Sequence, residues 1–101
     1  GCASSAMNEG RSGQPDRIIN STEEALKVAE CVQFSWQDEA VFGVDASGYL
    51  ERTAQGITVS TRGGEYFTDV SASGSGSVVR FYAQQDDALA QRRMAALATC
   101  L

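Results

Sequence analysis

Residues 24–36 read EALKVAECVQFSW, and this stretch predicts an amphipathic helix that carries a cysteine, Cys31. Its apolar side chains recur every three or four positions, so they share one face of a helix. These side chains are Ala25, Val28, Ala29, Val32 and Trp36. We interpret Trp36, which ends the apolar row, as a packing anchor, because a large aromatic side chain in this position fills core volume.

A second stretch with helical spacing closes the chain and carries Cys100. Asp86 or Asp87 can cap its N-terminus, because a carboxylate there accepts hydrogen bonds from free backbone N–H groups. If the two helices lie side by side on one face of a sheet, Cys31 and Cys100 can meet. We therefore predict a structural disulfide between them. The alternative is a redox pair, but that chemistry usually needs a Cys-x-x-Cys at a helix N-terminus.

Between the two helices the apolar period changes from about 3.6 to 2, which indicates β-strands. Turns that contain glycine separate the strands, and the short connections favour an antiparallel meander. The predicted strands are residues 41–44, 49–53, 57–62, 65–71 and 78–82. The predicted fold class is therefore α+β: an N-terminal helix, an antiparallel meander of four to five strands and a C-terminal helix. Both helices are expected on one sheet face, joined by the disulfide.

The N-terminal residues are predicted to lie outside this fold. Residues 3–16 are rich in Ser, Gly, Asn and charge and show no apolar period, so they read as a flexible tether. Gly1-Cys2 resembles the end of a bacterial lipobox, whose cysteine receives a diacylglycerol after the signal peptide is removed. The alternative is an N-terminal cysteine without that role. We expect Cys2 to be the lipid attachment site, residues 1–19 to be anchor and tether, and residues 20–101 to be a single domain.

Composition narrows the classes of function. The chain has 101 residues, a net charge of −5 and no histidine. The negative charge and the lack of a basic run argue against nucleic-acid binding. Without histidine, Ser–His and Cys–His catalysis is excluded, and no spacing typical of metal ligands appears. No stretch approaches the roughly 20 apolar residues that span a bilayer. We expect no enzyme activity, no metal and no cofactor.

One sheet face is the candidate binding surface. If Ile57 and Val59 point toward the helices, the residues that alternate with them point away, and an antiparallel sheet can leave that face exposed. The candidate residues on this face are Thr58, Ser60, Arg62, Arg80 and Tyr82. Such a surface can bind a peptide, a glycan or a protein, or it can be an ordinary solvated face.

Several of these features together resemble a known group. The run from Val28 to Val32 with Cys31, then Trp36, then Asp69-Val70, and finally Val79-Arg80-Phe81-Tyr82 and Ala95 to Cys100 are similar to small, uncharacterised proteobacterial lipoproteins. The resemblance implies a lipid-anchored protein of the bacterial cell envelope that faces the periplasm. Ala3 after the lipid site, in place of Asp, resembles the outer-membrane sorting pattern of enteric bacteria, so we expect the outer membrane. Its partners would be the membrane, through the lipid, and an envelope protein or glycan. We expect a monomer that acts as a structural or binding module.

A second resemblance suggests an alternative function. Ser71-Ala72-Ser73-Gly74, followed by Val79-Arg80-Phe81-Tyr82, is similar to the Ser-Gly segment of periplasmic inhibitors of c-type lysozyme. This resemblance implies an inhibitor of a lysozyme-like glycosidase, in which Ser73 and Arg80 would reach into the acidic cleft of the enzyme. The inhibitor family is all-β and lacks helices joined at both ends, so this chain departs from it there.

Overall fold

The computed structural model describes residues 2–38 and 48–101, and side chains from Ser5 onward within those ranges. The predicted strand at residues 41–44 lies outside the described residues. The helices and strands, in chain order, are α1 (Cys2–Arg11), β1 (Arg17–Ser21), α2 (Ala25–Asp38), β2 (Tyr49–Thr53), β3 (Gly56–Ser60), β4 (Tyr66–Ser73), β5 (Gly76–Ala83) and α3 (Ala88–Ala98).

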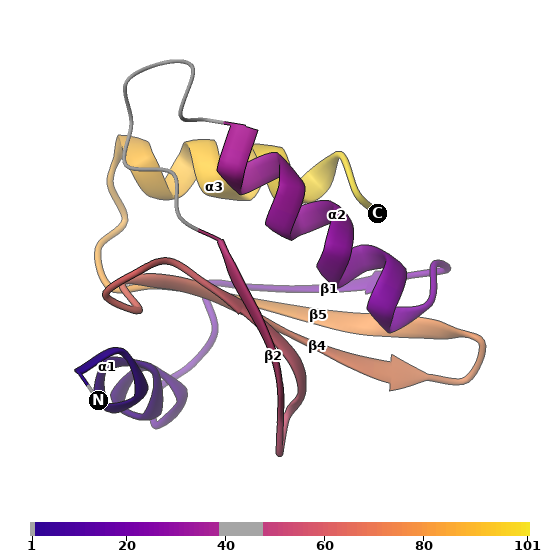
Figure 1. Cartoon of the computed structure of the whole chain (residues 1–101), viewed down its shortest axis with the longest axis horizontal. Helices are drawn as coiled ribbons and strands as arrows, with labels where there is room; N and C mark the ends of the chain where they lie inside the picture. Colours follow the sequence, from indigo (N-terminus) through magenta and orange to yellow (C-terminus); the bar gives the residue numbers. More distant parts are fainter. Residues whose placement is uncertain (1, 39–47) are drawn as a thin grey trace.

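The five strands form one antiparallel sheet in the order β1-β5-β4-β3-β2. Strands β2 to β5 follow one another as a meander, whereas β1 comes first in the chain and pairs with β5. Helices α2 and α3 lie on one face of the sheet and α1 lies on the other (Figure 1). The predicted α+β fold, with α2 and α3 together on one face, is confirmed.

The main core lies between the sheet and the helices α2 and α3. Trp36 is fully buried there, as its place at the end of the apolar row predicts. Its indole N–H donates to the backbone oxygen of Arg93 at 3.1 Å, and its ring meets Phe81 edge-on with 6.4 Å between centroids. The buried guanidinium of Arg93 lies 5.7 Å from the centre of the Trp36 ring. Trp36 therefore ties α2 to both α3 and β5.

The predicted disulfide between Cys31 and Cys100 is confirmed. It joins α2 to the residues just after α3, with the two Cα atoms 5.7 Å apart and the cysteines 69 positions apart in the chain. The bond closes most of the domain, from the middle of α2 to the end of the chain, into one covalent loop.

The flexible tether predicted for residues 3–16 is wrong. Residues 2–11 form α1, which packs on the sheet, and β1 pairs with β5 through all five of its residues. The predicted boundary at residue 19 falls inside β1, so both N-terminal elements belong to the folded domain. The apolar signal is weak because Met7 is the one large apolar side chain buried among those that the structure describes in α1, and an ion pair supplies another part of the contact.

Asp87 caps the N-terminus of α3, one of the two residues predicted for this role. Its carboxylate accepts a hydrogen bond from the backbone N–H of Ala90 at 2.8 Å. The Tyr66 hydroxyl donates to the two carboxylate oxygens at 3.0 and 3.1 Å. These bonds favour the ionised carboxylate and lower the pKa of Asp87, with the Ala90 bond as the largest cause. Burial, followed by the bond to Asp87, raises the pKa of Tyr66.

Replacing Asp87 with asparagine is expected to remove a contribution to stability that depends on pH. Asparagine also caps helices, so the variant removes the charge and keeps the cap. A carboxyl group whose folded-state pKa is lowered stabilises the fold above its unfolded pKa, here 3.8, and loses that contribution as the pH falls through the folded value. The advantage of the wild type in free energy of unfolding should therefore be complete above about pH 5 and shrink in more acid solution.

Urea unfolding of both proteins between neutral and strongly acid pH measures this difference. Asp86→Asn is the matched control, because Asp86 is the neighbouring exposed carboxylate and is not the cap residue. A difference between wild type and Asp87→Asn that stays constant down to the acid end of the series would contradict the assignment.

Candidate functional site

The predicted binding residues Thr58, Ser60, Arg80 and Tyr82 lie on the sheet face opposite α2 and α3, so the predicted alternation is correct. Thr58 pairs with Asp69, and Asp69 pairs with Arg80 across the next strand. The prediction that this face is exposed is wrong for three of the four residues, because Thr58, Ser60 and Tyr82 are only 0 %, 4 % and 8 % exposed. Helix α1 covers this face (Figure 1).

The other predicted residues are spread apart. Arg80 is half-buried, and its Nη1 donates to the hydroxyl of Ser71 at 3.4 Å. Arg62 is exposed in the loop between β3 and β4. Ser73 lies four ladder positions from Asp69, the partner of Arg80, which corresponds to about 13 Å along the strand. Ser73 and Arg80 are therefore not adjacent, and the inhibitor alternative gains no support from their placement and stays a prediction.

A forked ion pair holds α1 on the sheet. Arg11 Nε donates to Asp69 Oδ2 and Arg11 Nη2 to Asp69 Oδ1, both at 2.7 Å. Thr58 completes the group, because its hydroxyl donates to Asp69 Oδ1 at 2.7 Å and accepts from Arg11 Nη2 at 3.1 Å. The side chain of Asp69 is 2 % exposed and that of Arg11 is 16 % exposed. The hydrogen bond to Asp69 is the main reason that the pKa of Arg11 is raised.

Apolar contacts between α1 and the sheet form a second, smaller core of Met7, Phe67 and Tyr82. The Phe67 and Tyr82 rings stack with 4.6 Å between centroids and 9° between planes. Arg11 also lies over Phe67, with its guanidinium carbon 5.0 Å from the ring centroid. A methyl group at Gly10 would lie only 3.1 Å from Phe67 Cε1, so glycine allows the helix to approach this closely.

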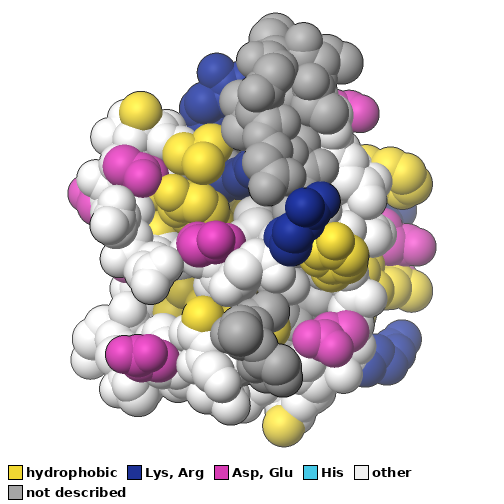
Figure 2. All heavy atoms as spheres, turned by 60° about the vertical axis from the view of Figure 1, so that its left-hand side comes forward, with side chains coloured by type: hydrophobic (Ala, Val, Ile, Leu, Met, Phe, Trp, Pro, Cys, Tyr) yellow, Lys and Arg dark blue, Asp and Glu magenta, His cyan; other side chains and the backbone are white. Residues whose placement is uncertain are grey.

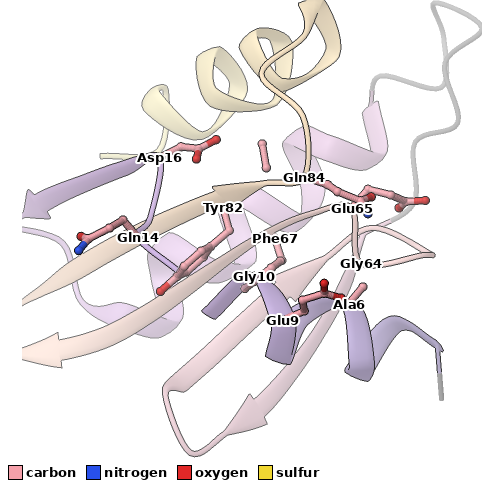
Figure 3. A pocket seen from close by; sticks show the side chains of 11 residues that line it. Ala6, Glu9, Gly10, Gln14, Asp16, Gly64, Glu65, Phe67, Tyr82 and Gln84 are labelled. Atoms are coloured by element: carbon pink, nitrogen blue, oxygen red, sulfur yellow. The ribbon is translucent and has the colours of Figure 1, made fainter. Parts of the chain in front are cut away.

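A pocket of about 220 Å³ opens beside this second core, where α1, the β3–β4 loop and the segment before β1 come together (Figure 3). Phe67 and Tyr82 lie between Glu65 on one side and Asp16 on the other, and Glu9 reaches in from α1 (Figure 3). The three carboxylates thus come from three separate segments. The remaining lining residues are small or uncharged: Ala6, Gly10, Gln14, Gly64, Ala83 and Gln84. No lysine or arginine side chain belongs to the lining.

The Tyr82 hydroxyl is the polar group of the pocket's aromatic part. Tyr82 is 8 % exposed, and its hydroxyl forms no hydrogen bond within residues 2–38 and 48–101. It lies on the side of the pocket where Gln14 stands (Figure 3). Burial is the largest of the effects that raise the pKa of Tyr82, so the phenol stays uncharged at neutral pH. An uncharged phenol can both donate and accept a hydrogen bond.

A wider groove of about 790 Å³ runs between α3 and β1. Phe81, Met94 and small residues of α3 give it an apolar floor, and its charged residues, Asp16, Arg17 and Asp86, have mixed signs. Because of these mixed signs, the groove favours neither a cationic nor an anionic ligand. The face of the molecule in Figure 2 shows both acidic and basic side chains around small areas of apolar surface.

The sequence does not predict the residues that build the pocket or hold α1. Glu9, Asp16 and Glu65 are far apart in the chain, and nothing in their spacing brings them together. Asp69 did carry a signal, because aspartate is disfavoured in strands. A lone carboxylate between Thr68 and Val70 indicates a specific partner on the polar face of the sheet.

Within the part of the chain that the structure describes, no three His, Cys, Asp or Glu side chains are grouped so that they can hold a metal ion. The same residues contain no helix of the length and apolar character needed to cross a bilayer. Comparison of the chain with protein-family models, with curated proteins and with solved structures found no match.

Proposed function

We propose that the protein is a binding module of the bacterial cell envelope, anchored by a lipid on Cys2, whose ligand site is the pocket between α1 and the sheet. The observation that carries the proposal is the docked α1. Its bidentate contact from Arg11 to the buried Asp69 fixes one wall of a pocket that contains a stacked aromatic pair. Concave sites with an apolar floor and a few convergent polar groups are typical ligand sites.

The disulfide supports the choice of compartment. Disulfides persist in oxidising environments such as the bacterial periplasm and are rare in the cytosol. The bond between Cys31 and Cys100 is part of the folded domain, so a periplasm-facing location suits this chain. The outer membrane remains the more specific proposal, and it rests on the sequence resemblance alone.

The docked helix also determines how a lipid anchor would act. Cys2 begins α1, and Arg11, which is bonded to the sheet, ends it. A helix of ten residues is about 15 Å long. A lipid on Cys2 would therefore hold the domain close to the bilayer surface, without the flexible tether predicted from composition. The pocket, which Glu9 and Gly10 help to line, would then lie near the membrane.

Protein expressed with its natural signal is expected to enter the detergent phase on phase separation, whereas Cys2→Ser protein should stay almost entirely in the aqueous phase. The reason is that the acyl chains of a diacylglycerol on Cys2 would hold the protein in the membrane, since burial of each CH₂ of an acyl chain contributes about 0.8 kcal/mol to membrane binding. Both proteins should contain the oxidised Cys31–Cys100 pair, which serves as the control for folding. Equal partitioning of the two proteins would remove the lipid anchor from the proposal.

The binding part of the proposal is tested separately, with a mixture of neutral, anionic and cationic small compounds added to isotopically labelled protein. Shifts of the backbone amide signals of Gly10, Gly64 and Ala83, which all line the pocket, are expected for at least one class of compound. If no class shifts these signals, the pocket is not the ligand site.

A further inference from the structure

The chemistry of the pocket indicates which ligands it selects. On the basis of the proposed function, we infer that the pocket binds the cationic end of an arginine-like ligand: a guanidinium group on a short alkyl chain, as presented by an exposed arginine of a polypeptide. Three independent features lead to this ligand class: the charge of the rim, the aromatic floor and the size of the cavity.

The rim is uniformly acidic. Glu9, Asp16 and Glu65 approach the cavity from α1, from the segment before β1 and from the β3–β4 loop, and no basic side chain lines it. The nearest guanidinium on the α1 side, that of Arg11, already forms an ion pair with Asp69 and does not compete for these carboxylates. Carboxylates from separate segments can bond one guanidinium from several directions, because this group presents five N–H donors in a planar fork.

The aromatic floor already binds one guanidinium. Phe67 and Tyr82 stack face to face, and the Arg11 guanidinium lies over the Phe67 ring at 5.0 Å. A planar guanidinium stacks well on an aromatic face and at the same time bonds a carboxylate in its own plane. Arg11 does both, with Phe67 and Asp69. Phe67 and Tyr82 also line the pocket, where Asp16 stands on the Tyr82 side of the stacked pair and Glu65 on the other side (Figure 3).

The Tyr82 hydroxyl supplies a group that is independent of the carboxylates. Tyr82 is 8 % exposed, and its hydroxyl is not one of the buried polar atoms that lack a partner, so the hydroxyl is accessible from outside. An accessible hydroxyl can accept a hydrogen bond from an incoming N–H donor. A ligand with several N–H donors can therefore bond this hydroxyl and the carboxylates at the same time.

The cavity volume of about 220 Å³ limits the size of the ligand. Pockets for drug-sized molecules are usually about 300–1,000 Å³, so this one accommodates a group the size of a single side chain. An arginine side chain is within this limit, whereas a folded surface or a large ring system is not.

The test uses two probes that differ almost only in charge, N-acetyl-argininamide and its neutral isostere N-acetyl-citrullinamide, titrated into the labelled full chain. The arginine probe is expected to shift the amide signals of Gly10, Gly64 and Ala83 and to bind at least about fivefold more tightly than the citrulline probe. Because the carboxylates are exposed, added salt should lower the affinity for the arginine probe several-fold and leave the affinity for the citrulline probe unchanged.

A double variant, Glu9→Gln with Glu65→Gln, removes two charges from the rim at exposed positions. Its affinity for the arginine probe should be about fivefold lower than that of the wild type. Glu30→Gln is the matched control, because Glu30 is exposed on α2, on the other side of the sheet. Equal binding of the two probes, equal affinity of the double variant and the wild type, or no shift of the pocket signals by the arginine probe would each overturn the inference. Pocket shifts caused by neutral or anionic compounds would still support the proposed function, so the two failures are distinguishable.

Discussion

Arg11→Ala is expected to lower the free energy of unfolding by about 3 kcal/mol, although Arg11 lies in a segment whose composition indicates a flexible tether. The substitution leaves the carboxylate of Asp69, whose side chain is 2 % exposed, without its cation. Removing one partner of a buried ion pair typically costs about 3–5 kcal/mol, and the 16 % exposure of Arg11 places this pair at the lower end. Urea unfolding measures the change, and faster amide hydrogen exchange throughout α1 should accompany it.

A double-mutant cycle separates the pair from other effects of the substitution. Asp69→Asn removes the charge of the acceptor. The loss in free energy of unfolding should be smaller for the double variant than the sum of the losses for the two single variants, and the difference, which is the coupling energy, should be about 1–3 kcal/mol. Arg17→Ala is the control for a surface arginine and should change stability by less than about 0.5 kcal/mol, since Arg17 is exposed. A cost for Arg11→Ala as small as that of Arg17→Ala would show that α1 is not fixed to the sheet by this contact.

The parts of the fold that sequence reasoning recovers are those with a local signal. The apolar row that ends at Trp36 predicts α2, the alternation from Ile57 onward predicts β3, and the acidic pair that contains Asp87 predicts the start of α3. Each of these signals lies within one element or its immediate flanks. The pairing of Cys31 with Cys100 follows once the two helices are placed on one sheet face.

The N-terminal elements have no comparable local signal. Strand β1 contains two adjacent apolar residues, Ile18 and Ile19, and therefore shows no alternation. Its place in the sheet depends on β5, about 60 positions further along the chain. Among the side chains of α1 that the structure describes, from Ser5 onward, Met7 is the one buried apolar side chain and Arg11 is the ion-pair donor. In a sequence, a segment with such polar contacts looks like an exposed segment.

The exposure of the candidate binding face could not be predicted for the same reason. Alternation correctly places Thr58 and Tyr82 on the face opposite α2, but it does not report whether a distant segment covers that face. Because α1 packs on this face, these residues are buried instead of lying at the surface. The candidate ligand site consequently moves to the edge of α1, where Glu9, Glu65 and Tyr82 line one pocket.

The disulfide is expected to have the largest effect on stability of any feature of the domain. Replacing Cys31 and Cys100 together by alanine should lower the free energy of unfolding by about 2–5 kcal/mol. Closing a loop of 69 positions restricts the unfolded chain by an amount that corresponds to about 4 kcal/mol at 25 °C. For a domain of this size, such a loss should lower the melting temperature by more than about 10 °C.

Comparison of oxidised and reduced wild-type protein separates the cross-link from packing, because the two forms differ only by the S–S bond and two hydrogen atoms. Reduction should loosen the C-terminal turn first, where the N–H groups of Thr99 and Cys100 bond to the last carbonyls of α3. Hydrogen exchange at these two amides should therefore accelerate before exchange in β4 does. Thiol titration of oxidised, non-lipidated protein should detect Cys2 alone. Three reactive thiols, or equal stability of the oxidised and reduced forms, would show that the bond does not hold α2 against the end of α3.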